Sequence, residues 1–218
     1  MKPKLPLPCL CLVTDRGRTA SDDIVNTARG AVAGGVGMVQ LRDKDCPAAE
    51  MLSLARELRS VTEGRALLIV NDRVDIALLS GADGVQLGEN GLDAASARRL
   101  VGSEMLIGRS VHSVEGAVKA ESSGADFLVL GTIFETASHP GADTGGLKLV
   151  RDVTDRIGIP VIGIGGISKS NVAGLVESGA AGAAVITAVS MAADPKAASL
   201  NILEAMRHAY SCVAELRL

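Results

Sequence analysis

"GADGVQLG" (residues 81–88) and "GADFLVLG" (residues 124–131) are two copies of the phrase that decides the fold. "GGVGMVQLR" (34–42) and "GAAGAAVIT" (179–187) share its form. Each copy begins with a glycine that can end a helix, because glycine adopts the left-handed conformation at little cost. A small-residue turn and a short apolar run follow, and such a run is typical of a strand buried on both faces of a parallel sheet.

The rest of the chain contains further units of the same kind. Four more apolar runs predict strands: "CLCLVT" (9–14), "ALLIVN" (66–71), "MLIGRS" (105–110) and "PVIGIGG" (160–166). Stretches with helical spacing of apolar residues lie between them, for example "AAEMLSLARELRSV" (48–61). Eight strand–helix units predict an α/β fold, a (β/α)₈ TIM barrel, as a single domain over residues 1–218. An open doubly wound sheet is the alternative, but its "GxGxxG" turn is absent after the first strand.

The composition excludes several classes of protein. The formal net charge is −3, with two phenylalanines, one tyrosine and no tryptophan, so a nucleic-acid partner is not expected. No apolar run approaches the roughly 20 residues of a membrane span. The four cysteines show neither metal-ligand spacing nor the density of a secreted disulfide scaffold. We therefore expect a cytoplasmic protein without a membrane partner, and its apolar helices would allow a homodimer.

Polar residues follow nearly every predicted strand. A single polar residue there is usually a helix cap or a turn, but a TIM barrel gathers all its strand ends at one catalytic rim. Polar groups at many strand ends therefore predict a shared pocket. The candidate site residues are Gln40, Arg42, Lys44, Asn71, Asp72, Ser110, His112, Thr136, Gly165, Gly166, Ile186 and Thr187.

Two of these strand ends predict anion-binding positions. "GIGGIS" (163–168) and "AVITAV" (184–189) end the last two strands, where TIM barrels often bind phosphate. Glycines there let backbone N–H groups approach an anion, although a tight turn that needs positive φ would also explain them. In "QLRDK" (40–44), two cations on one side of the pocket predict a second anionic group. The alternative is that these two cations form a solvated charge cluster with the neighbouring aspartates and bind no ligand.

The "IGRSVHS" stretch (107–113) supplies a candidate acid–base group. Imidazole can take and return a proton near neutral pH, and His112 follows the predicted strand directly. Ser110 would face the pocket as His112 does, provided that Arg109 turns outward to pair with a helix acid. A structural histidine that bonds a neighbouring loop is the alternative. In "VNDRVD" (70–75), Asp72 could hold a metal, accept from a hydroxyl or cap the next helix.

Together these phrases resemble the thiamine phosphate synthase and TenI superfamily. The resemblance rests on "QLRDK", "VNDRVDIALLSGADGVQLG", "IGRSVHSVEGAVKAESSGADFLVLGTIFET", "PVIGIGGI" and "GAAVITAV", and it covers essentially the whole chain. It implies a (β/α)₈ barrel that binds phosphorylated thiamine precursors. In the synthase branch, two carboxylates hold Mg²⁺, which in turn holds the pyrophosphate released when a pyrimidine diphosphate is joined to a thiazole phosphate.

The chain departs from the synthase pattern at two positions. Asp72 matches the first carboxylate, but Gly91 stands where the second is expected, in "QLGENGL" (86–92). His139 replaces a lysine in "GTIFETASH" (131–139). Glu89, two positions from Gly91, is an alternative ligand. The synthase reading therefore implies Mg²⁺ on Asp72, with an incomplete ligand set.

The phrases "GRSVHS" and "FET" are similar to the TenI branch, which implies a thiazole tautomerase. Such an isomerase aromatises a small phosphorylated thiazole, and it needs no metal or cofactor. His112 would move the proton, with Ser110 beside it, while the glycine turns hold the phosphate. We therefore expect a tautomerase. Thiamine phosphate synthase is the alternative, favoured by the synthase-like Asn71, Asp72, Arg42 and Lys44, and a non-catalytic protein that binds thiazole or thiamine phosphate is the third reading.

Overall fold

The structure is a computed structural model, and it describes residues 2–20, 23–136, 141 and 143–215. Eight parallel strands close into a barrel in sequence order, β8 pairing with β1. The strands are β1 (Cys9–Val13), β2 (Met38–Leu41), β3 (Leu67–Asn71), β4 (Gly84–Leu87), β5 (Leu106–Val111), β6 (Phe127–Leu130), β7 (Val161–Ile164) and β8 (Gly182–Val185). The predicted (β/α)₈ TIM barrel is confirmed.

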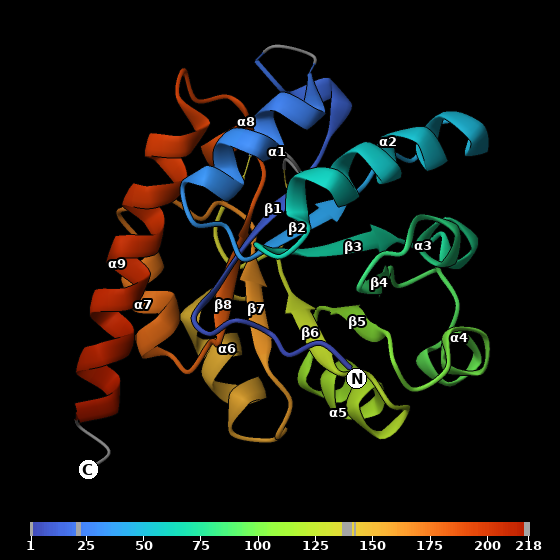
Figure 1. The fold of residues 1–218 in the computed structure, drawn as a ribbon. Helices are drawn as coiled ribbons and strands as arrows, with labels where there is room; N and C mark the ends of the chain where they lie inside the picture. Colours follow the sequence, from blue (N-terminus) through green and yellow to red (C-terminus); the bar gives the residue numbers. More distant parts are fainter. Residues whose placement is uncertain (1, 21–22, 137–140, 142, 216–218) are drawn as a thin grey trace.

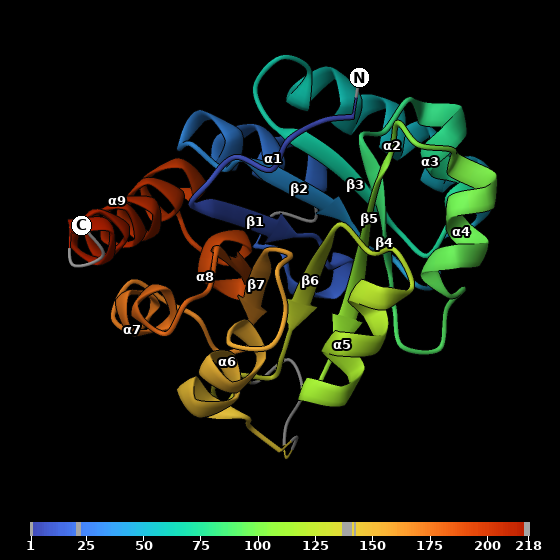
Figure 2. The ribbon, with the colours of Figure 1, turned by 90° about the horizontal axis from the view of Figure 1, so that it is seen from below.

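The helices lie outside this ring of strands (Figures 1 and 2). They are η1 (Arg16–Arg18), α1 (Ile24–Ala33), α2 (Ala48–Thr62), α3 (Val74–Ser80), α4 (Ala94–Val101), α5 (Val114–Ser122), α6 (Gly146–Thr154), α7 (Val172–Glu177), α8 (Thr187–Ser190) and α9 (Pro195–Glu215). Among the described residues, none of them is long and apolar enough to cross a bilayer.

The aspartate of the repeated "GAD" phrase joins three elements of the barrel. Asp83 stands directly before β4, and its Oδ2 accepts from the backbone N–H of Leu68 in β3 at 2.7 Å. The same oxygen accepts from Arg59 Nη1 of α2, also at 2.7 Å. Hydrogen bonds to charged groups are stronger than neutral ones. Asp83 therefore ties the start of its own strand to the preceding strand and to the helix before that.

The second copy of the phrase repeats this arrangement. Asp126 stands directly before β6, and its Oδ2 accepts from Ile107 N of β5 at 2.7 Å and from Arg98 Nη2 of α4 at 2.6 Å. The aspartate thus has a structural role at the end of the barrel where strands begin.

The core has an inner and an outer part. Side chains that point into the barrel form one cluster, which includes Cys9, Cys11, Met38, Ile69 and Phe127. The outer cluster fills the space between the strands and the helices. Both cysteines are buried free thiols. Burial raises the pKa of the Cys9 thiol to about 12, because a thiolate there would lose its hydration.

Candidate functional site

A cavity of about 1020 Å³ opens where the strands end. The parallel register brings these ends together, since Val13 pairs with Gln40, and Asn71 pairs with Gln86. Every residue that the sequence marks as a candidate lines it: Gln40, Arg42, Lys44, Asn71, Asp72, Ser110, His112, Thr136, Gly165, Gly166, Ile186 and Thr187. Their placement agrees with the prediction, and their roles remain predictions.

Some lining residues were missed by reasoning from the sequence. Asp143 and Thr144 lie in the segment between β6 and α6, and both line the cavity. This long connection has no apolar period that would indicate which of its residues face inward. His139, expected in the same connection, lies outside the described residues.

The turn after β7 has the conformation that its glycines allow. Gly165 has φ 105° and Gly166 has φ 63°, both in the region that favours glycine. A Cβ on Gly166 would lie 2.3 Å from the carbonyl oxygen of Glu135, so the turn also packs closely on the segment after β6. Asn171 Nδ2 donates to Gly166 O at 2.9 Å and fixes the turn. The turn therefore does need positive φ at both glycines, and it also faces the cavity where a phosphate is expected.

A chain of hydrogen bonds leads from β2 to the carboxylate of Asp72. Gln40 Nε2 donates to Asn71 Oδ1 at 2.8 Å, and Asn71 Nδ2 donates to Asp72 Oδ2 at 2.8 Å. The other carboxylate oxygen, Oδ1, accepts from Gly88 N at 2.7 Å. Asp72 has φ 55°, a left-handed conformation that aspartate tolerates better than most residues. The carboxylate is thus held in one orientation from both sides.

Gly91 lies directly against this carboxylate. A Cβ at residue 91 would be only 2.5 Å from Asp72 Oδ1. No group of three or more His, Cys, Asp or Glu side chains suited to a metal occurs in the part of the chain that the structure describes. Asp72 therefore offers one carboxylate, which is the least that Mg²⁺ requires when substrate phosphates supply other ligands. Glu89, the alternative ligand, lies beside His112 instead, with 3.7 Å between Oε2 and Nε2.

His112 is held by the end of a neighbouring strand and still reaches the cavity. Its Nδ1 is hydrogen-bonded to the carbonyl oxygen of Gly131, which can only accept. Nδ1 therefore carries the proton, and Nε2 is the unprotonated nitrogen of the neutral ring. The side chain is 56% exposed, so Nε2 is accessible to a ligand. The structural and the acid–base readings of this histidine are both compatible with this geometry.

Two residues of the same strand behave differently from each other. Ser110 faces the cavity, as expected, and its Oγ accepts from Gln86 Nε2 at 3.0 Å. Arg109 does not pair with a helix acid, so that expectation is wrong. Its guanidinium donates to the carbonyl oxygens of Leu92 at 2.6 Å and Glu89 at 3.0 Å. The planar guanidinium can donate to two main-chain carbonyl oxygens in the same way as it donates to the two oxygens of a carboxylate. Arg109 therefore holds the segment after β4.

Comparison with known proteins gives consistent matches over most of the chain. The family described as thiamine monophosphate synthase (TMP-TENI) matches residues 10–189. A putative thiamine-phosphate synthase of Geobacter sulfurreducens is 46% identical over 189 residues, covering 86% of this chain and 89% of that protein. A thiamine-phosphate synthase of Methanoculleus marisnigri is 44% identical over 199 residues, covering 88% of this chain and 92% of that protein.

A solved structure agrees with these matches. The thiamine phosphate pyrophosphorylase from Pyrococcus furiosus superposes with a TM-score of 0.86 and 37% identity, covering 92% of this chain and 96% of that chain. The Geobacter and Methanoculleus relatives are named as synthases and the Pyrococcus structure as a pyrophosphorylase, and none of the three is named as a TenI protein. The predicted superfamily is confirmed, but these relatives do not favour its TenI branch.

Proposed function

Because this chain belongs to the thiamine monophosphate synthase (TMP-TENI) family, we propose that it is a thiamine-phosphate synthase. In this reaction a thiazole phosphate and a pyrimidine diphosphate are joined, and pyrophosphate is released. The proposal replaces the tautomerase as the first candidate. It is supported by the names of the relatives and by two separate sets of candidate anion-binding residues that line the cavity, the turn at Gly165 and Gly166 and the cations Arg42 and Lys44.

One observation carries the proposal: two cations and a carboxylate, Arg42, Lys44 and Asp72, line the same cavity. The carboxylate of a substrate placed near Asp72 would be repelled by it. A diphosphate that brings a divalent cation would not be repelled, because the positive charge of the cation would offset the repulsion between the negative groups. This combination suits a diphosphate better than the single carboxylate of a tautomerase substrate.

Different residues of the cavity would bind each of the two substrates. The turn at Gly165 and Gly166 would hold the thiazole phosphate, and Arg42 and Lys44 would balance the charge of the diphosphate. Asp72 would hold Mg²⁺, whose charge would help to stabilise the leaving pyrophosphate. The new C–N bond forms at the thiazole nitrogen as the C–O bond to the diphosphate breaks. Two substrates that are bound side by side react faster, because the entropy cost of bringing them together has been met on binding.

A tautomerase is the second candidate, and His112 and Gly91 favour it. In its neutral form, His112 presents Nε2 as an acceptor beside the cavity, as a proton carrier would need. Gly91 leaves Asp72 without the second carboxylate expected of a synthase. Proton transfer within a thiazole requires no leaving group, so the loss of a metal ligand would not affect it.

One assay separates the candidates. The purified protein is given both synthase substrates, with and without Mg²⁺, and thiamine phosphate and pyrophosphate are measured. We expect equal amounts of the two products, formed only with Mg²⁺, and strongly reduced formation by Asp72→Asn. Turnover of the thiazole carboxylate phosphate tautomer without any synthase activity would contradict the proposal. Binding of thiazole phosphate with neither reaction would indicate the non-catalytic reading.

A further inference from the structure

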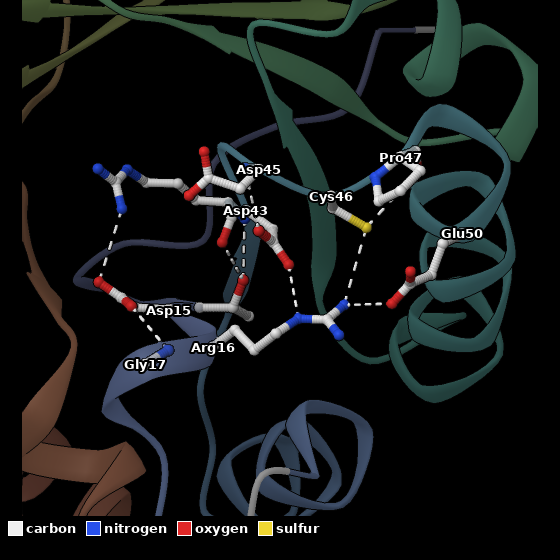
Figure 3. A network of polar contacts seen from close by, with 10 residues as sticks. Asp15, Arg16, Gly17, Asp43, Asp45, Cys46, Pro47 and Glu50 are labelled. Carbon is white, nitrogen blue, oxygen red and sulfur yellow. Dashed lines mark hydrogen bonds and ion pairs between the residues drawn. The ribbon is translucent and has the colours of Figure 1, made fainter.

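Arg42 and Lys44 lie on a segment without regular secondary structure. Residues 42–47 connect β2 to α2, and none of them belongs to a strand or a helix. Two cations on such a connection bind an anion well only if the connection itself is held in place, because ordering it on binding would cost affinity. The support comes from the segment that follows β1 (Figure 3).

Arg16 contacts the connection at two points and the following helix α2 at a third. Its Nε donates to Asp43 Oδ2 at 2.8 Å, and its Nη2 donates to Glu50 Oε1 of α2 at 2.7 Å. Nη2 also lies 3.7 Å from Cys46 Sγ. The Asp43 side chain is only 9% exposed, whereas that of Arg16 is 50% exposed. Arg16 therefore covers Asp43, and it links the beginning of the connection to the helix at its end, as Figure 3 shows.

A second set of contacts from the same segment holds Arg42 itself. Thr14 Oγ1 accepts from the backbone N–H of Arg42 at 2.9 Å and donates to its carbonyl oxygen at 3.1 Å. Asp15 Oδ2 lies 3.6 Å from Arg42 Nη1. Both the main chain and the guanidinium of Arg42 are thus directed by residues 14–15. Asp15 in turn accepts from Gly17 N at 3.1 Å.

The supporting segment is anchored independently on the side of α8. Ala20 N donates to the carbonyl oxygen of Ser190 at 3.0 Å, and Ser190 Oγ donates to Arg18 O. Ser190 is 2% exposed, so this anchor belongs to the packed part of the barrel. Residues 14–20 are therefore held against the barrel, and from this position Arg16 can support the connection that carries Arg42 and Lys44.

We propose that Arg16 is a positioning residue for the part of the cavity lined by Arg42 and Lys44, where it holds the connection so that these two cations face the ligand. The identification of that ligand as a diphosphate rests on the proposed function. Half-exposed ion pairs contribute little to global stability. A small displacement of binding groups, however, lowers rates and affinities strongly, up to about a hundredfold for 1 Å. The effect of losing Arg16 should therefore appear in anion binding and not in folding.

The test measures binding of inorganic pyrophosphate, with Mg²⁺ present, by titration calorimetry. Arg16→Ala should weaken this binding about tenfold or more. Arg16→Lys should recover part of it, because lysine can pair with one carboxylate but lacks the fork that reaches both. The control is Arg99→Ala on α4, which removes an exposed guanidinium that donates to Ser96 Oγ at 3.1 Å. It should bind pyrophosphate as the wild type does.

Two further measurements separate positioning from general damage. Backbone amides of residues 43–46 should exchange hydrogen faster in Arg16→Ala, while the melting temperature stays within a degree or two of the control. In the synthase assay, the KM for the pyrimidine diphosphate should rise and the KM for the thiazole phosphate should not.

The outcomes are distinct for this inference and for the proposed function. Unchanged pyrophosphate binding in Arg16→Ala, or wild-type protein that binds no pyrophosphate, would overturn the inference. Wild-type protein that binds pyrophosphate but forms no thiamine phosphate would overturn the proposed function. Weaker pyrophosphate binding by Arg16→Ala would still support Arg16 as a positioning residue in that case.

Discussion

Replacing Gly91 by aspartate should restore a second carboxylate beside Asp72, and the structure sets the size of the effect. The new Cβ would lie 2.5 Å from Asp72 Oδ1, so that oxygen must retreat by roughly 0.8 Å to reach an ordinary C···O contact of about 3.3 Å. This displacement of Asp72 Oδ1 weakens the 2.7 Å hydrogen bond that it accepts from Gly88 N. Such a bond contributes about 1.5–3 kcal/mol when shielded from solvent. Asp72 is exposed, so we expect a loss of about 1 kcal/mol.

The matched control is Gly91→Ala, which has the same Cβ and no carboxylate. In the absence of Mg²⁺, each variant should melt roughly 2–4 °C below the wild type, as a loss of about 1 kcal/mol implies for a chain of this length. Gly91→Asp should melt lowest, because two carboxylates then repel each other. Each melting curve is measured by circular dichroism.

Addition of Mg²⁺ should reverse this order. A ligand that binds the folded state at a hundredfold excess over its Kd stabilises the protein by about 2.7 kcal/mol. The melting temperature of Gly91→Asp should then rise by roughly 5–11 °C, and that of Gly91→Ala should rise no more than the wild type. Mg²⁺-dependent synthase activity should also reach half-maximum at a lower Mg²⁺ concentration in Gly91→Asp. Equal responses of the aspartate and alanine variants to Mg²⁺ would refute the reasoning that Asp72 belongs to a metal site.

Three further predictions concern catalysis, the barrel and pH. If the tautomerase reading is correct, His112→Ala should lower kcat for the thiazole tautomer about 10²–10⁴-fold with little change in KM; a normal kcat in steady-state assays would assign His112 a structural role. Asp83→Ala should lower the free energy of unfolding by about 3 kcal/mol in urea titrations, because Leu68 N and Arg59 lose their charged acceptor; Asp83→Asn, which keeps a neutral acceptor, should lose clearly less. The raised pKa of the buried Cys9 thiol, about 12, means that the unfolded chain releases this proton first, near pH 8.5. Stability should therefore fall as the pH rises from about 8.5 to 12, and a Cys9→Ala variant should show a shallower fall in unfolding titrations over this range.

The strands and the rim of the barrel could be predicted because their signals are local and periodic. The run "CLCLVT" (9–14) predicts β1, and the structure places it at Cys9–Val13. The helical pattern of residues 48–61 corresponds to α2, Ala48–Thr62. Once eight parallel strands are expected, their carboxyl ends must meet at one rim. For this reason the candidate residues could be predicted to share a cavity without any knowledge of the distances between them.

The contacts made by individual polar side chains could not be predicted in the same way. Arg109 was expected to meet a helix acid and instead binds two carbonyl oxygens of the segment after β4. The conformation of such a segment has no period in the sequence, so its carbonyl directions appear only in the folded chain. The function of Asp83, which repeats at Asp126, likewise depends on which helix packs beside the preceding strand.

The sequence by itself determined that this protein is a barrel with a polar rim and that Gly91 stands where a synthase has a carboxylate. Only the tertiary structure decided what this glycine does: it leaves room for the carboxylate of Asp72, which turns to Gly88 N. Likewise, only the tertiary structure decided that Arg16 supports the segment carrying Arg42. The physical reason is the same in both cases. Apolar patterning acts along the chain over a few residues, whereas a charged side chain takes its partner from whatever the packed elements bring within about 3 Å.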